Sequence, residues 1–259
     1  MDGLLDTRGM QRQRPIVITP YYQEERSLLE RCIASVRAQT VACDHLLVAD
    51  GHPQEWIGTA GVRHLRLDRA HGDYGNTPRG VAAVLAAAEG YSAIAMLDAD
   101  NWLEADHLAL CQEAAQNGPG GVCDFVIARS LLRRPDGTVI PWPAQSPDEH
   151  VDTNCFYFLP GSFHLLASWA LMPRELSPIG DRVFWGAMRT KGLVGVVVNR
   201  PTVNYHCLWE SIYRAVGETP PPGCKPDTDS ESVQAWLRSL DDRQLEIASR
   251  LIGARPARP

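Results

Sequence analysis

The sequence predicts an α/β fold in which helices flank a mainly parallel central β-sheet. Short apolar runs alternate with helical patterns through residues 15–104, and the connections between them are brief. Strands linked through helices in this way run parallel, because each crossover returns the chain to the same end of the sheet. Hydrophobic residues make up 44% of the 259 positions, which is enough for one large core.

Four apolar runs of the first half have the length and the β-branched content of buried strands. These runs cover residues 15–22, 44–51, 62–67 and 92–98. Apolar side chains at helical spacing predict a helix over residues 25–40, between the first two strands. An alanine-rich helix is expected over residues 79–90, with Thr77 as its N-cap and Pro78 at the first helical position.

The second half is less regular and mixes strands with helices. A hairpin is predicted over residues 123–140, turning at Asp136 and Gly137. A strand is predicted over residues 193–208, with its last polar position at His206. Helices are expected over residues 104–116, 164–173, 180–192 and 230–252, the last of them amphipathic.

The charge and the cysteine content argue against several classes of protein. A net charge of −6 and a pI near 5.7 disfavour a basic face that would bind nucleic acid. The seven cysteines are scattered without a C-x-x-C pair, which disfavours a zinc knuckle or a disulfide framework. No run approaches the ~20 apolar residues of a transmembrane helix, and the N-terminus lacks a signal peptide's apolar region. We therefore expect a cytoplasmic protein, either free or in peripheral contact with a membrane.

The segment LDADN ends the fourth predicted strand with two carboxylates, Asp98 and Asp100. Residues i and i+2 of an extended segment face the same side, so the two carboxylates converge. Adjacent carboxylates repel each other, and a Mg²⁺ or Mn²⁺ ion held by them and by a substrate diphosphate removes that repulsion. Such an ion stabilises negative charge on a departing nucleoside diphosphate. The alternative interpretation is a polar turn that starts the next helix.

Several motifs in this order resemble the family 2-like glycosyltransferases with the GT-A fold. The resemblance rests on IVITPYYQEERSLLERCIASVRAQTVACDHLLVADG and on GNTPRGVAAVLAAAEGYSAIAMLDADN, and it extends to GDRVFWGAMRTKG. It implies a Rossmann-like single domain over residues 1–259 with a C-terminal helix. Residues 15–104 would bind the nucleotide sugar, residues 105–215 would form the acceptor and catalytic half, and residues 216–259 would form a loop and that helix.

The resemblance assigns a nucleotide role to six residues of the first half. Those residues are Thr19, Pro20, Tyr21, Asp50, Arg79 and Asp98. Thr19 and Tyr21 would flank the base, Tyr21 by stacking or packing on it, and Asp50 would accept a hydrogen bond from the base. Arg79 would contact the base or the diphosphate. Asp98 would contact the ribose and a metal-bound water.

The resemblance also assigns metal ligands and a base. Asp100 would bind the metal directly, with Asp98 beside it and His206 completing the site, although a lone histidine is also common as a structural residue. Asp181 stands where inverting members carry their general base, and Gly180 replaces the glutamate that usually precedes it. An N-cap of the following helix is the alternative role for Asp181.

Four further residues are candidates for diphosphate or sugar contacts. Tyr213 and Arg214 would reach the diphosphate from a closing loop. Asp152 and Asn154 would hydrogen-bond sugar hydroxyls, or they form a polar turn.

Together these residues predict a metal-dependent glycosyltransferase that moves a sugar from a nucleoside-diphosphate sugar, with UDP or GDP as the nucleotide, to an acceptor hydroxyl. Inversion with Asp181 as base is favoured. A retaining enzyme and a catalytically silent sugar-nucleotide-binding relative are the alternatives. The acceptor is left open between a small molecule, a glycan and a lipid-linked molecule, and the oligomeric state is left open too.

Overall fold

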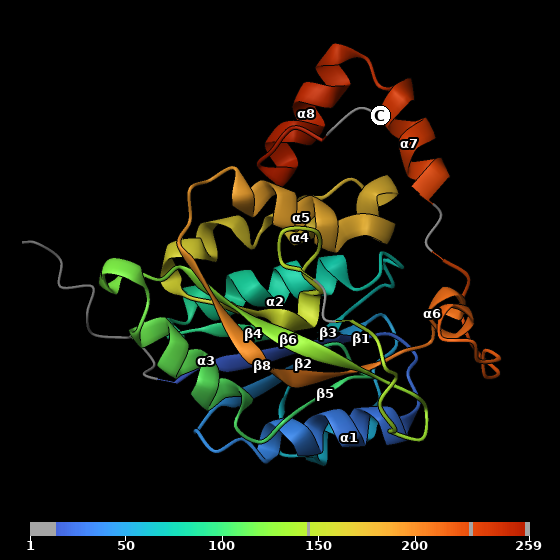
Figure 1. Ribbon diagram of the computed structural model, residues 1–259. Helices are drawn as coiled ribbons and strands as arrows, with labels where there is room; N and C mark the ends of the chain where they lie inside the picture. The colour runs from blue at the N-terminus through green and yellow to red at the C-terminus, as the bar shows by residue number, and fades with distance from the viewer. Residues whose placement is uncertain (1–13, 144–145, 228–229, 257–259) are drawn as a thin grey trace, which may run out of the picture.

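The computed structural model describes residues 14–143, 146–227 and 230–256, and one eight-stranded sheet runs through them (Figure 1). The strands are β1 Ile16–Tyr21, β2 Asp44–Asp50, β3 Arg63–Leu67, β4 Ile94–Met96, β5 Trp102–Leu103, β6 Phe125–Arg133, β7 Phe156–Phe158 and β8 Gly195–His206. Their order across the sheet is β3-β2-β1-β4-β7-β6-β8-β5.

Parallel pairing builds the half of the sheet that contains the first four strands. β1 lies between β2 and β4 and runs parallel to both, and β2 runs parallel to β3. β7 runs antiparallel to both β4 and β6, and β5 runs antiparallel to β8, whereas β6 and β8 are parallel. The predicted α/β fold is confirmed, and the antiparallel strands of the second half make the sheet mixed.

Helices cover both faces of the sheet. They are α1 Arg26–Arg37, α2 Asn76–Ala88, α3 His107–Gln116, α4 Ser168–Leu171, α5 Gly180–Arg189, α6 Glu210–Ala215, α7 Ser230–Ser239 and α8 Asp242–Ile252. Figure 1 shows α1 on one face and α2 on the other, with α4 and α5 beyond α2 and the pair α7–α8 outermost. α3 packs along β6 and β8.

Helix α1 forms where the apolar spacing predicts it. Leu29, Cys32, Ile33 and Val36 are its buried residues, and they recur at the three- and four-residue steps of one helical face. At the roughly 25 cal/mol per Å² of apolar burial, such a stripe stabilises the docked helix by several kcal/mol.

The start of α2 differs from the prediction. The helix begins at Asn76 after Gly75, which has a φ of 79° and serves as N-cap, so Thr77 is not the cap. The cap interaction comes instead from Asp73, whose Oδ2 accepts hydrogen bonds from the Thr77 backbone N–H at 2.9 Å and hydroxyl at 2.6 Å. A left-handed residue at position 75 starts the helix two residues earlier than a threonine cap at position 77 would.

The C-terminal helix is two helices, α7 and α8, rather than the single predicted one. Asp241 ends the run, because its side chain accepts from the Gln244 backbone while the Gln244 side chain accepts from the Asp241 backbone. This capping box starts a new helix inside a sequence whose apolar spacing continues across the break.

Two other predicted elements are also modified. The turn at Asp136–Gly137 is present, but the returning strand makes only one bridge, between Arg133 and Val139, and β6 pairs mainly with β8 and β7. The helix predicted over residues 164–173 is split into a 3-10 helix, Pro160–Leu165, and the short α4.

The seven cysteines all lie among the described residues and are free thiols, in agreement with the expectation of no disulfide framework. Within those residues no helix has the length and apolar character needed to cross a bilayer.

Replacement of Gly80 by alanine should disturb the contact between α2 and α4. A Cβ there would lie 2.4 Å from the Ala170 backbone nitrogen. Overpacking of this kind costs about 1–3 kcal/mol, so the Tm in a thermal melt should fall by several degrees. Gly186→Ala in α5 is the matched control, because a Cβ at Gly186 meets nothing within 4 Å. An equal Tm for the Gly80 variant and the wild type would contradict the close approach.

Candidate active site

The carboxyl ends of three parallel strands meet at one edge of the sheet. Tyr21 pairs in register with Ala49, next to Asp50 at the end of β2. The Leu97 backbone N–H donates to the Ile18 carbonyl at 3.0 Å, which holds the end of β4 beside β1. Ligands of such sheets bind beyond the carboxyl ends of the strands, so the side chains here form the candidate site.

The Asp98 carboxylate is held from both sides. Its Oδ1 accepts from Arg79 Nη2 at 2.7 Å, and its Oδ2 accepts from Asn154 Nδ2 at 2.9 Å. The Asn154 side-chain oxygen also accepts the Asp98 backbone N–H. The orientation of Asp98 therefore depends on α2 and on the segment before β7.

Arg79 is buried, with 3% of its surface exposed. Its Nη1 donates to Asn76 Oδ1 at 3.1 Å, and its guanidinium carbon lies 5.0 Å from the centre of the Trp169 ring. A guanidinium so enclosed neutralises Asp98. The structure thus places Arg79 behind Asp98 rather than in the open position that contact with a base or a diphosphate requires.

Asp152 and Asn154 form a turn that is directed at Asp98. Asp152 Oδ1 accepts from the Asn154 backbone N–H at 2.9 Å and from Asn154 Nδ2 at 2.7 Å. Burial raises the pKa of Asp152, and the charges of Asp98 and Asp181 raise it further. Asp152 consequently lies within the electrostatic reach of both carboxylates.

Asp100 is the second carboxylate of the strand end, and among the residues that the structure describes no Lys, Arg or His side chain forms an ion pair with it. Burial raises the pKa of Asp100 to about 7, with a further contribution from Asp98 and an opposing one from Lys225. Arg31 Nη2 donates to the Asp100 backbone carbonyl at 2.8 Å, while its guanidinium lies 3.9 Å above the Trp102 ring. A carboxylate that is costly to ionise is a fitting ligand for a cation.

His206, the last residue of β8, is tied to the same strand end. Its backbone N–H donates to Asn101 Oδ1 at 2.7 Å, and its ring Nδ1 is buried without a hydrogen-bond partner. Burial lowers the pKa of His206, and the charges of Arg31 and Lys225 lower it further, so the ring is neutral at pH 7. A neutral imidazole with an unpartnered nitrogen can act as a metal ligand. It binds zinc more strongly than Mg²⁺ or Mn²⁺, but it does bind Mn²⁺.

No group of three His, Cys, Asp or Glu side chains is gathered for a metal in the part of the chain that the structure describes. The raised pKa of Asp100 and the orphaned nitrogen of His206 nevertheless fit a cation whose remaining ligands come from a diphosphate and water.

Thr19 and Tyr21 are buried rather than open to a base. Side chains alternate along a strand, and these two face α1. Thr19 Oγ1 lies 3.6 Å from Cys32 Sγ of α1 and 2.9 Å from His45 Nε2 of β2. The Tyr21 hydroxyl lies 2.8 Å from His64 Nε2 and accepts from the Gln54 backbone at 2.9 Å. The structure therefore places neither side chain where a base could contact it.

The neighbouring positions are also occupied by protein contacts. Pro20 is buried, and its ring lies 3.2 Å from the point where a Cβ on Gly75 would be. Asp50 accepts from the backbone N–H groups of His71 and Gly72 and lies 2.7 Å from His71 Nδ1. A base N–H would have to share or displace these contacts at Asp50.

Tyr213 and Arg214 do not approach the strand ends. The Tyr213 hydroxyl donates to the Cys207 carbonyl at 3.0 Å inside a small apolar cluster. Arg214 is exposed and forms an ion pair with Glu210 at 2.6 Å. The structure does not bring their polar groups to Asp98 or Asp100.

Asp181 lies in the first turn of α5, whose N-cap is Ile179, so the N-cap role is excluded. Its Oδ2 lies 2.6 Å from His150 Nε2, and its Oδ1 accepts from the Arg182 backbone at 2.7 Å. A Cβ on Gly180 would lie 2.7 Å from Asn76 Nδ2. Glycine at position 180 thus allows α5 to approach Asn76, the partner of Arg79.

A family model described as glycosyl transferase family 2 matches residues 16–167, more than half of the chain. The chain belongs to glycosyl transferase family 2. No curated protein matches this glycosyltransferase.

Solved structures of S. aureus TarS are similar to the glycosyltransferase. The crystal structure of TarS 1–349 in complex with UDP has a TM-score of 0.54 at 13% identity, over 93% of this chain and 71% of that one. TarS 1–349 alone has a TM-score of 0.53 at 14% identity, again over 93% of this chain and 71% of that one. The likeness confirms the GT-A fold, and the family establishes an enzyme that uses a nucleotide sugar.

Four residues of the glycosyltransferase site were not among the predicted ones. They are Arg31, Asn101, His150 and Lys225. Asn101 had a visible signal, because it directly follows Asp100 at the strand end. His150 lies two residues before the predicted Asp152 but has no pattern of its own, and Arg31 and Lys225 reach the site from distant segments.

Substitution of Asp100 by asparagine should stabilise the glycosyltransferase at high pH in metal-free buffer with EDTA. An acid whose pKa is raised from about 3.8 to about 7 by folding binds its proton more tightly in the folded state. Its ionisation therefore opposes folding, and this destabilisation grows as the pH rises from about 3.8 to about 7. The free energy of unfolding of Asp100→Asn should exceed that of the wild type, and this difference should be at least about 1 kcal/mol larger at pH 8 than at pH 5.

Asp98→Asn is the contrasting variant in urea titrations at both pH values. It removes the charge opposite the buried Arg79, and it should lower stability. A gain at Asp100 that does not change with pH would contradict the burial of its charge.

Proposed function

We propose that this glycosyltransferase transfers a sugar from a UDP-sugar to an acceptor hydroxyl with inversion, and that a divalent cation supports the reaction. One observation carries the proposal: Asn154 Nδ2 donates to both Asp98 Oδ2 and Asp152 Oδ1, and the charges of Asp98 and Asp181 both raise the pKa of Asp152. A donor held at one carboxylate and an acceptor activated by the other is what a single displacement requires.

The choice of UDP rests on the likeness to TarS, whose residues 1–349 were crystallised in complex with UDP. GDP is the second candidate nucleotide. The base would enter near the ends of β1 and β2. Tyr22 is 42% exposed there and could contact the base, whereas Tyr21 is buried. We assign Asp50 to base recognition only together with a rearrangement of His71 and Gly72.

The metal-binding residues would be Asp100 and His206, with Asp98 reaching bound water. Mg²⁺ or Mn²⁺ at this position would supply positive charge opposite the departing diphosphate. Lys225 adds positive charge to this metal site, because its charge lowers the pKa of Asp100. Lys225 belongs to a segment that is anchored by its own backbone N–H to the Leu208 carbonyl at 2.6 Å.

Asp181 would take the proton of the acceptor hydroxyl. As the O–H bond breaks, the acceptor oxygen forms a bond to the anomeric carbon, and the bond from that carbon to the diphosphate oxygen breaks on the opposite face. The diphosphate leaves with the bonding electrons. The proton stays on Asp181 until it is lost to solvent.

Nucleotide binding should depend on the metal ligands. Calorimetric titration of the wild type with UDP, GDP, CDP and dTDP, with and without Mn²⁺, should give metal-dependent binding of one nucleotide. Asp100→Ala should abolish the metal-dependent part, and His206→Ala should weaken Mn²⁺ affinity by about 10- to 100-fold.

Glu246→Ala, in the exposed ion pair of α8, is the control and should titrate like the wild type. Equal UDP affinity with and without Mn²⁺ would remove the metal from the proposal. Failure of every nucleotide to bind would remove the donor assignment itself.

Asp181→Asn should keep nucleotide binding and lose turnover by about 10²–10⁴-fold, the usual contribution of a general base. The assay is release of UDP from UDP-glucose, UDP-galactose and UDP-N-acetylglucosamine with water as acceptor. NMR of the first-formed sugar anomer reports the stereochemistry.

Unchanged turnover in the variant would exclude Asp181 as the base. A product with the donor's anomeric configuration would indicate a retaining enzyme. Nucleotide binding without turnover in the wild type would indicate a silent relative.

A further inference from the structure

Asp181 is bonded to a histidine that lies 31 residues earlier in the chain. The Nε2 of His150 lies 2.6 Å from Asp181 Oδ2, and the two side chains are only 20% and 25% exposed. The other carboxylate oxygen accepts the Arg182 backbone N–H at 2.7 Å. Each oxygen of this carboxylate therefore has a defined donor.

The segment that carries His150 is attached to the same helix as Asp181. Trp185 Nε1 donates to the Pro147 carbonyl at 2.8 Å, and Arg189 Nη1 donates to the Asp148 carbonyl at 3.0 Å. Both donors lie on α5, in the turns that follow Asp181. Two further hydrogen bonds thus hold the segment just before His150 against α5, which distinguishes this pair from a chance contact between surface side chains.

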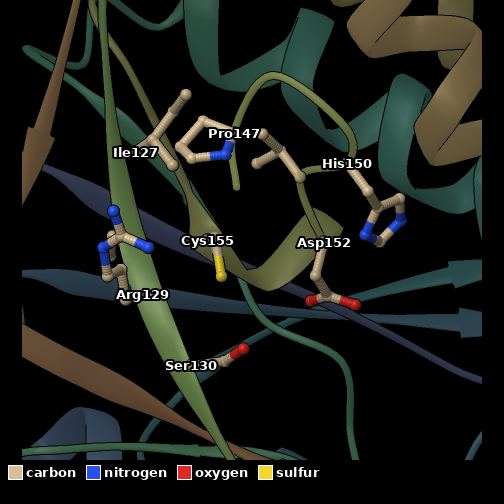
Figure 2. A pocket seen from close by; sticks show the side chains of 9 residues that line it. Ile127, Arg129, Ser130, Pro147, His150, Asp152 and Cys155 are labelled. Carbon is tan, nitrogen blue, oxygen red and sulfur yellow. The ribbon is translucent and has the colours of Figure 1, made fainter. Parts of the chain in front are cut away.

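His150 lies two residues before Asp152, whose Oδ1 accepts from Asn154 Nδ2, and that nitrogen also donates to Asp98. Figure 2 shows His150 and Asp152 on the same stretch of chain, with both side chains on the side away from Ile127 and Arg129 of β6. A cavity of about 30 Å³, large enough for water, lies between this stretch and β6.

The charged groups that face His150 come from its own segment and from α5. The hydrogen bond to Asp181 is the main cause that raises the pKa of His150, burial opposes it, and the charge of Asp152 raises it further. Arg182 acts in the opposite direction. The net direction is upward, so the imidazole titrates above its ordinary range.

We propose that His150 is a positioning residue for Asp181, which orients the carboxylate through Nε2–H and switches off its action as a base when the imidazole becomes protonated. This inference rests on the proposed function, in which Asp181 takes the acceptor proton. Neutral His150 donates one hydrogen bond and leaves the carboxylate basic. Imidazolium stabilises the ionised carboxylate as an ion pair, so the carboxylate takes a proton less readily.

The sign of the pH dependence follows from this pairing. Turnover is high where His150 is neutral and falls as the pH decreases through its raised pKa. A carboxylate base without such a partner would keep its activity down to about pH 4, its own ordinary range. The acid limb of kcat therefore separates a tuned pair from a lone aspartate.

The test compares His150→Gln, which keeps a donor but cannot titrate, with His150→Ala, which removes the donor. kcat for UDP release from UDP-glucose, UDP-galactose and UDP-N-acetylglucosamine is measured from pH 4.5 to 9. We expect the acid limb of the wild type to lie above the range of a lone carboxylate and the limb of His150→Gln to move to lower pH. His150→Ala should lose about 10- to 100-fold in kcat with an unchanged KM for the donor, the factor for a lost hydrogen bond to a charged group.

His164→Gln is the matched control, because this histidine is exposed and lies outside the site. NMR of the imidazole resonances of His150 measures the pairing independently of turnover. The pKa of His150 should be lower in Asp181→Asn than in the wild type. An unchanged His150 titration in that variant, or an acid limb that stays in place in His150→Gln, overturns the inference while the proposed function stands. Absence of UDP release from wild-type protein with all three donors overturns the proposed function first.

Discussion

The position of one carboxylate, Asp98, organises the candidate active site. Its two oxygens are divided between Arg79 and Asn154, so that it is at once neutralised and oriented. Arg79 in turn is enclosed by Asn76 and Trp169, and burial of its charge is acceptable only because Asp98 opposes it. This single ion pair connects α2, the end of β4 and the turn before β7. Loss of Asp98 would leave the charge of the buried Arg79 unpaired.

The two carboxylates of the LDADN segment differ because their neighbours differ. Asp98 has a buried guanidinium beside it, whereas Asp100 has only more distant positive charge and a pKa raised to about 7. Environments that separate the properties of adjacent acids are typical of sites in which the acids have different roles. Asp181 makes a third case, with a histidine in place of an arginine.

Parts of the site could be predicted because their signals are local. The end of a buried strand marks Asp98 and Asp100, and a helix start marks Asp181. Asp152 and Asn154 were expected as sugar contacts or as a polar turn, and the structure shows the turn, with Asn154 in contact with Asp98. Thr19 and Tyr21 were expected to be open, and the packing of α1 and of the 3-10 helix Glu55–Thr59 covers them instead. Which side of a strand end is covered depends on segments that lie elsewhere in the chain.

Local sequence patterns predict the strand–helix alternation, the parallel core of the sheet and the acidic strand end, because the periodicity of apolar residues and the ends of strands are properties of neighbouring residues. The charge that each carboxylate meets depends on contacts between distant segments. Arg79 binds Asp98 and His150 binds Asp181 through contacts between segments 19 and 31 residues apart. Such pairs form because folding removes water from them and leaves each polar group to its nearest partner, and that choice depends on the packing of the whole domain.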